Sequence, residues 1–160
     1  MATFERDMRV QAPLEDVWTF HSSVSGLERL TPAWMGLRIE SVIGPDGERD
    51  PVVLETGAEL DLSVRPFALG PRQHWTSVIT DRARQSGRAY FTDEMIRGPF
   101  ETWIHTHAFF ADGDATIVRD HVEYELPFGT LGNAVTPFSG VGFEGMFRDR
   151  HDRTRKSLEH

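Results

Sequence analysis

The feature that most constrains the fold is a run of six segments with alternating apolar and polar residues between Leu37 and Leu126. A period of two is typical of β-strands that bury one face. Short breaks rich in glycine, proline and aspartate separate the segments, which favours an antiparallel meander. Leu37, Ile39 and Ser41 are expected to share one face of the first of these strands. The six expected strands are 37–41, 59–64, 73–80, 88–97, 101–111 and 116–126.

One further strand and two short helices are expected before this run. Residues 3–10 alternate and predict the first strand of the chain. Pro13 suits the first position of a helix, because its fixed backbone angle is already helical there. Ser25 and Glu28 fit a capping box, which predicts that a second helix opens at this point and runs to Leu30.

The chain ends on a longer helical pattern. Phe138, Phe143 and Phe147 recur at roughly helical spacing, and arginines crowd the far end, where positive charge suits the helix dipole. Three glycines lie in the front half, and each costs about 1 kcal/mol relative to alanine within a helix. We therefore expect the front half of this helix to be bent, loose or partly unwound.

Composition favours a single globular domain. The chain has 160 residues, of which 39% are hydrophobic and 26% charged, and this mix argues against a disordered chain. The absence of cysteine excludes a disulfide scaffold, a thiolate zinc site and a cysteine nucleophile. Residues 158–160 have the sequence expected of an expression-tag remnant, so we expect one ligand-binding domain over residues 1–157.

Charge and hydropathy narrow the range of partners. The formal net charge of −8 repels nucleic acid, so no nucleic-acid partner is expected. No apolar run approaches the roughly 20 residues that span a bilayer, and no signal-peptide pattern is present. We expect a cytoplasmic protein, a monomer or homodimer, without a membrane span.

Two turns predict which residues of the last three strands share a face. A loop at 98–100 and a two-residue turn at 113–114 each set the register of one hairpin. Both registers place the same strongly apolar set on one side, so we take that side as the inner face. The expected cross-strand pairs are Met95–Trp103, Asp93–His105, Phe91–His107, Phe109–Val118, His107–Asp120, His105–Val122 and Trp103–Tyr124.

Four ionisable residues interrupt that apolar face: Asp93, His105, His107 and Asp120. Buried charges cost several kcal/mol unless they are paired. Three interpretations remain open. In the first interpretation the four residues form a structural network of histidine–carboxylate hydrogen bonds. In the second they are the polar anchors of a ligand pocket. The third interpretation is chemistry, in which an Asp–His pair is a general base or two imidazoles and a carboxylate bind a metal.

Arg6 also lies on the apolar face of its strand. The H-x-H pattern is weak by itself, so the sequence assigns no metal and no cofactor, and the four ionisable residues are catalytic candidates only.

Aromatic residues on the same face either fill the core or line a cavity. A large curved sheet that is covered by one loosened helix is difficult to fill, which favours a cavity. The candidate ligand-binding residues are Trp75, Phe91, Asp93, Met95, Trp103, His105, His107, Phe109, Asp120, Tyr124, Phe138 and Phe143.

The order of elements resembles the helix-grip arrangement of the START and Bet v 1-like (SRPBCC) superfamily, which includes polyketide cyclase/dehydrase-like proteins. Residues 10–18 are similar to the family's opening pattern I-x-A-P-x-x-x-V-W/F. Residues 93–109 are similar to a bacterial and archaeal subgroup with the pattern D-x-M-x-x-G-P-F-x-x-W-x-H-x-H-x-F. The resemblance implies an α+β fold in which a seven-stranded antiparallel curved sheet wraps around a long C-terminal helix.

Members of that superfamily bind lipids, sterols, quinones, polyketides or other apolar molecules, and some are enzymes. The resemblance therefore implies binding or transport of an apolar small molecule, lipid, quinone or polyketide-like, in a cavity between sheet and C-terminal helix. The alternative is a cyclase/dehydratase-type or isomerase-like enzyme, in which an Asp–His pair in the same cavity moves protons.

Overall fold

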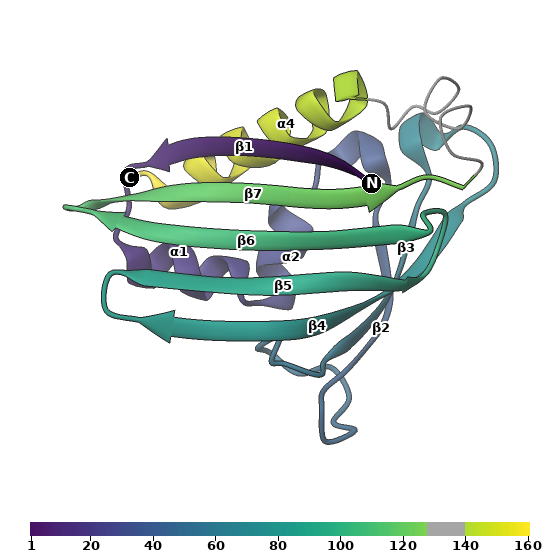
Figure 1. Cartoon of the computed structure of the whole chain (residues 1–160), viewed down its shortest axis with the longest axis horizontal. Helices are drawn as coiled ribbons and strands as arrows, with labels where there is room; N and C mark the ends of the chain where they lie inside the picture. The colour runs from purple at the N-terminus through teal and green to yellow at the C-terminus, as the bar shows by residue number, and fades with distance from the viewer. Residues whose placement is uncertain (128–139) are drawn as a thin grey trace.

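The structure, a computed structural model, describes residues 1–127 and 140–160. Figure 1 labels its strands and longer helices, and η1 and η2 are short 3-10 helices. Their order is β1 (Ala2–Val10), α1 (Leu14–His21), α2 (Val24–Leu30), η1 (Ala33–Met35), β2 (Arg38–Ile43), β3 (Glu59–Val64), η2 (Pro66–Ala68), β4 (Gln73–Gln85), β5 (Arg88–Arg97), β6 (Thr102–Asp112), β7 (Ala115–Glu125) and α4 (Gly140–Leu158).

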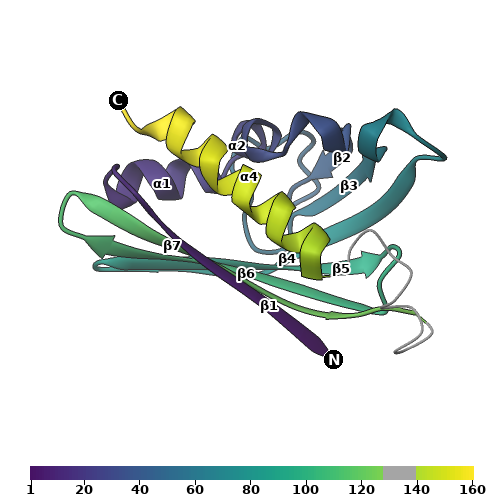
Figure 2. The same ribbon diagram turned by 90° about the horizontal axis from the view of Figure 1, so that it is seen from above.

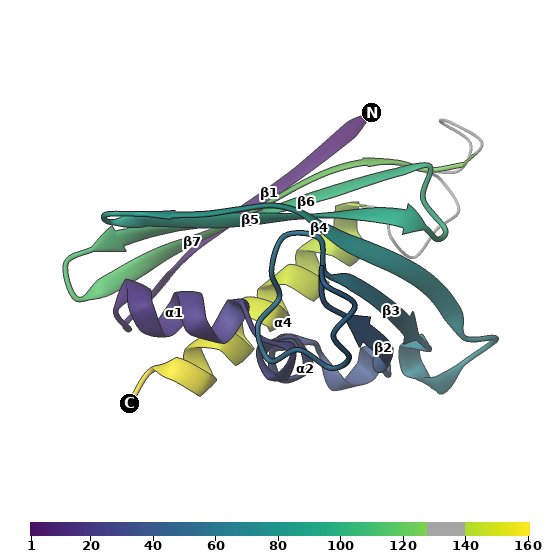
Figure 3. The ribbon, with the colours of Figure 1, turned by 90° about the horizontal axis from the view of Figure 1, so that it is seen from below.

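The seven strands form one antiparallel sheet in the order β1-β7-β6-β5-β4-β3-β2. From β2 to β7 each strand pairs with the next along the chain, and β1 joins the sheet beside β7. All the helices among the described residues lie on one face, where α4 crosses the sheet beside α1 and α2 (Figure 2). The strands β2 and β3 curve around these helices (Figure 3). The predicted helix-grip fold is confirmed.

The predicted register of the last three strands is confirmed for six of the seven pairs. Asp93 lies opposite His105 on β5 and β6, and His107 lies opposite Asp120 on β6 and β7. The ladder between β5 and β6 ends at the pair Glu94–Ile104, one step before the expected pair of Met95 and Trp103. The inner face is therefore the one that the two turns predict.

The start of α2 differs from the prediction. The helix is capped by Ser23 rather than Ser25, because Ser23 has the extended backbone of an N-cap (φ −115°, ψ 151°). Its hydroxyl accepts a hydrogen bond from the Gly26 backbone N–H at 3.0 Å. Ser25 already lies inside the first turn, so the expected capping box does not form.

A register shift in β2 corrects the expected inner face of that strand. The pairing with β3 shifts between Ile39 and Ser41, which puts Val42 into the core in place of Ser41. The Ser41 hydroxyl instead donates to the Asp61 carboxylate at 3.1 Å. One extra residue at a bulge moves the following side chains to the opposite face.

The C-terminal helix is continuous from Gly140 to Leu158, so its glycines at 142 and 145 do not unwind it. Phe138 lies outside the described residues. Leu158 ends the helix and packs against the main core. The domain boundary at 157 and the tag origin of the last three residues stay predictions. None of the described helices combines the length and the apolar character that crossing a membrane requires.

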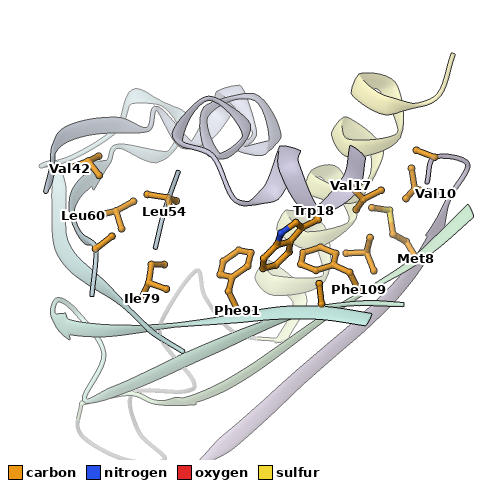
Figure 4. Packing of buried hydrophobic residues seen from close by; sticks show 14 of the residues in the cluster. Met8, Val10, Val17, Trp18, Val42, Leu54, Leu60, Ile79, Phe91 and Phe109 are labelled. Atoms are coloured by element: carbon orange, nitrogen blue, oxygen red, sulfur yellow. The ribbon is translucent and has the colours of Figure 1, made fainter. Parts of the chain in front are cut away.

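The core consists of two clusters of buried side chains. In the larger cluster the Trp18 ring packs against Phe91 and Phe109, at centroid distances of 6.1 and 5.9 Å (Figure 4). In the smaller cluster Phe143 and Phe147 of α4 pack on Val122 of β7. Burying each phenylalanine contributes about 1.5–3 kcal/mol. These contacts fix α1 and α4 on the inner face of the sheet.

Candidate functional site

A cavity of about 170 Å³ lies between the inner face of the sheet and the helices. Its walls come from α1, α2, η1, β3, β4, β5, β6 and α4, and most of the lining side chains are apolar. Eight of the twelve sequence-predicted residues line it: Trp75, Phe91, Asp93, Met95, Trp103, His105, His107 and Phe143.

Three predicted residues lie outside the cavity wall. Phe109 is fully buried in the main core, where its ring meets those of Trp18 and His21. Asp120 is buried behind the imidazoles of the wall, and Tyr124 packs edge-on against the Phe143 ring at 4.9 Å. These three share the inner face of the sheet with the wall residues, but neighbouring side chains cover them. Phe138 lies outside the described residues.

The helices supply lining residues that the sequence reasoning did not find. His21 of α1 and Arg150 of α4 both face the cavity. His151, also on α4, is 3% exposed and contacts the buried acid Asp120. A signal was present in the sequence, because Phe143, Phe147 and His151 recur at four-residue spacing and so share a helix face.

The four predicted ionisable residues form one buried network. His105 Nε2 donates to Asp120 Oδ1 at 2.7 Å, and His107 Nε2 lies 3.0 Å from Asp93 Oδ2. The directly opposed contacts are longer, at 3.7 Å from His105 Nδ1 to Asp93 and 3.4 Å from His107 Nδ1 to Asp120. The two imidazole rings lie 3.7 Å apart between their centroids. Each histidine therefore contacts both acids, and the shorter contacts run diagonally across the strands.

Asp120 receives hydrogen bonds from beyond the sheet as well. His151 Nε2 donates to Asp120 Oδ2 at 2.6 Å, so α4 and β6 meet at this carboxylate. His151 Nδ1 is buried and has no hydrogen-bond partner among the described residues. One carboxylate thus holds the C-terminal helix on the sheet through a charged hydrogen bond.

The environment keeps both acids ionised. Burial alone would raise the pKa of Asp120, but hydrogen bonds from His105, His107 and His151 hold it well below its ordinary value. Burial also acts to raise the pKa of Asp93, and the hydrogen bond from His107 outweighs it, so this pKa is lowered too. Two ionised carboxylates therefore lie at this part of the cavity, Asp93 in its wall and Asp120 behind it.

The two imidazoles of the wall titrate differently. Burial, with the neighbouring His107 adding to it, lowers the pKa of His105 to about 4. Burial also acts to lower the pKa of His107, but the hydrogen bonds that this ring donates to Asp120 and Asp93 outweigh it and raise this pKa above its usual value. The network keeps one histidine neutral and favours a proton on the other.

Two arginines lie near the network. Arg150 lines the cavity, and burial lowers its pKa while Asp120 and Asp93 act to raise it. A guanidinium stays protonated in proteins, so it brings a positive charge to this wall. Arg6, which the sequence places on the apolar face of β1, forms an ion pair with Glu144 of α4.

One group of described residues could hold a metal ion. Asp93, His105 and His107 each offer one ligand atom within 4.8 Å of the others, and all three line the cavity. The arrangement can orient a polar ligand group, transfer a proton or bind a cation.

Comparison with known proteins identifies the family. Residues 10–151 match the family model described as "Polyketide cyclase / dehydrase and lipid transport". The chain belongs to this family. The SRPBCC resemblance that the sequence motifs indicated is thereby confirmed. None of the curated proteins matches the chain.

Solved structures support the fold of this polyketide cyclase family member. A Chromobacterium violaceum protein is 16% identical with a TM-score of 0.70, over 100% of this chain and 99% of its own. Norcoclaurine synthase from Thalictrum flavum, in complex with dopamine and hydroxybenzaldehyde, is 20% identical with a TM-score of 0.67. The match covers 99% of this chain and 87% of the synthase. A START superfamily protein from Mycobacterium smegmatis is 14% identical with a TM-score of 0.61. The match covers 98% of this chain and 97% of that protein. At these identities the likeness concerns the fold alone.

Proposed function

We propose that this protein binds or transports an apolar small molecule that carries one polar group. The observation that supports this best is an apolar cavity with a charged patch of Asp93, His107 and Arg150 on one wall. Ligand pockets combine these two features, because apolar walls supply affinity and a few polar groups set orientation. The family's description, which includes lipid transport, agrees with this function.

The size of the cavity limits what it accepts without rearrangement. Its volume of about 170 Å³ is close to that of an engineered apolar cavity of about 150 Å³ that binds benzene. A single ring therefore fits the described cavity. Each 100 Å² of apolar ligand area that is buried contributes about 2.5 kcal/mol, before the cost of ordering the ligand.

Native mass spectrometry of the protein purified without a polyhistidine tag tests this function. We expect an apolar molecule to copurify at close to one per chain and to appear in a solvent extract of the same sample. For protein that purifies empty, anilinonaphthalene sulfonate is the probe, and we expect saturable fluorescence enhancement with one site per chain.

A matched pair of tryptophan variants locates the site. Trp103 lines the cavity and packs on Phe143, whereas Trp34 stacks on Phe67 outside it. Trp103→Ala should change the affinity for the probe several-fold, and Trp34→Ala should not. Equal affinity in wild type and Trp103→Ala would contradict binding in this cavity.

A second candidate function is a cyclase/dehydratase-type or isomerase-like enzyme. His107 faces the cavity, contacts both acids and has a raised pKa, so it is suited to give up a proton near neutral pH. Turnover of an extracted ligand would then show a bell-shaped pH profile that His107→Ala and His105→Ala abolish. Full activity in both variants would remove this candidate.

A further inference from the structure

We propose that Asp93, His105 and His107 form a binding site for one divalent transition-metal ion in the cavity wall. The site goes beyond the binding of an apolar molecule and does not depend on it. The H-x-H pattern alone is too weak to assign a metal. The geometry adds three observations: converging ligand atoms, a His105 nitrogen that lies beside the Asp93 carboxylate, and a second carboxylate that holds both imidazoles from behind.

The ligand atoms lie at separations close to those of a metal site. Asp93 Oδ2 is 3.0 Å from His107 Nε2 and 3.7 Å from His105 Nδ1. Metal–ligand bonds of about 2.1 Å place neighbouring ligand atoms roughly 3.0–3.4 Å apart. All three ligand atoms lie within 4.8 Å of one another, so no pair needs to close by more than about 1.5 Å. Two imidazoles and one carboxylate form a facial set that suits iron, cobalt or zinc and leaves further positions open.

The hydrogen bond of His105 to Asp120 leaves the other ring nitrogen of His105 facing Asp93. Its Nε2 carries the hydrogen that Asp120 accepts at 2.7 Å. A neutral imidazole that donates through Nε2 has a lone pair on Nδ1. In that tautomer Nδ1 and Asp93 Oδ2, which are 3.7 Å apart, are both available to a cation. A metal ion between them would bind both.

Asp120 occupies the place of a supporting carboxylate. Metal-binding histidines usually donate their second ring N–H to a carboxylate, which fixes the ring and its tautomer. Asp120 Oδ1 lies 2.7 Å from His105 Nε2 and 3.4 Å from His107 Nδ1, the nitrogens that face away from Asp93. His151 holds the other oxygen of Asp120 at 2.6 Å. The imidazoles are therefore oriented before any metal arrives.

The charges of the wall allow a cation to bind there. Arg150 of α4 carries one positive charge and opposes the ion. The two carboxylates, Asp93 and Asp120, each contact both imidazoles and oppose that charge. An ion that binds His107 Nε2 takes the place of the hydrogen through which this nitrogen contacts Asp93. All three proposed ligands line the cavity. Open coordination positions would thus face a bound molecule, and a carbonyl, hydroxyl or carboxylate oxygen could occupy one of them.

Titration of chelator-treated, tag-free protein with Co²⁺ and Zn²⁺ tests the site. Visible d–d absorption of Co²⁺ reports ligand geometry, and calorimetry with Zn²⁺ gives stoichiometry and affinity. We expect one ion per chain, with binding at least about tenfold weaker in Asp93→Asn and about 10–100-fold weaker in Asp120→Asn. The control is His121→Ala, an exposed histidine of β7 that contacts Glu5, and it should bind as wild type does.

Two results would overturn the proposal. One is wild-type protein that binds neither ion saturably at concentrations up to about 0.1 mM. The other is binding that Asp93→Asn leaves unchanged, and its loss in His121→Ala would then place the ion on the surface. Near-ultraviolet circular dichroism checks that each variant folds, and His107→Gln replaces Asp93→Asn if that variant does not. Binding of anilinonaphthalene sulfonate to the metal-free protein tests the apolar cavity separately from the metal site.

Discussion

Removing the carboxylate of Asp120 should be among the most destabilising single changes in this protein. Asp120 is 4% exposed and accepts hydrogen bonds from His105 on β6 and from His151 on α4. Asp120→Ala removes the acceptor for both donors and leaves them buried. It also removes one of the two acids that His107 contacts.

The size of the loss follows from the burial of this network. Breaking a buried charged pair by deleting one partner costs about 3–5 kcal/mol, because the other group stays buried and unpaired. For a chain of this length, each kcal/mol lowers the melting temperature by roughly 2–4 °C. The variant should therefore melt about 6–20 °C lower than wild type.

Urea denaturation at pH 7, followed by tryptophan fluorescence, measures the free energy of unfolding. The matched control is Asp7→Ala, because Asp7 forms an ion pair with Arg119 at 2.8 Å on the exposed face of the same sheet. Exposed pairs contribute about 0–1 kcal/mol, so the control should lose little. If Asp120→Ala lowered the free energy of unfolding no more than Asp7→Ala does, the reasoning that the network is a buried, paired cluster would be wrong.

Three further predictions concern the cavity and its surroundings. Burial lowers the pKa of His21 to about 3. The unfolded chain binds this proton near pH 6.5, so stability falls as the pH falls below that, by about 2 kcal/mol at pH 5. Replacing His21 by Gln should flatten the slope of unfolding free energy against pH, and an unchanged slope would contradict the assignment. A Cβ at Gly98 would lie 2.7 Å from the Trp75 Cβ and would also clash with the Met95 side chain. Gly98→Ala should therefore cost about 1–3 kcal/mol and alter probe binding, and unchanged urea and fluorescence titrations would argue against the close approach. Phe143 is 1% exposed, so Phe143→Ala should lose about 3–5 kcal/mol in urea denaturation. A loss below 1 kcal/mol would mean that α4 does not pack on the sheet as described.

The inner face of the last three strands was predictable because it depends on local chemistry. Turn residues at 98–100 and 113–114 set the register of two hairpins, and a period of two then assigns each side chain to a face. Asp93, His105, His107 and Asp120 were brought together in this way, as the structure confirms. The bulge in β2 was missed, since nothing in its sequence distinguishes an extra residue from a regular alternation.

The residues that α4 contributes to the site were not predicted, although apolar and histidine residues recur in its sequence at four-residue spacing. Phe143, Phe147 and His151 lie on one helical face, but the pattern does not say which part of the sheet this face meets. The partner of His151 could therefore not be predicted, because it depends on where α4 lies over β7 and β6. The diagonal contacts of the network could not be predicted from the sequence either. They depend on the direction of each side chain, which the strand register does not determine.

The sequence by itself determined the order of strands and helices, the identity of the inner face and the presence of two acids and two histidines upon it. Periodicity, turn residues and helix spacing are local properties, so they can be interpreted without the fold. Only the tertiary structure decided that Asp120 is buried behind the imidazoles, that His151 contacts it from α4, and that Arg150 of the same helix lines the cavity beside Asp93. Those facts depend on how far α4 stands from the curved sheet, and many distant contacts set that separation together.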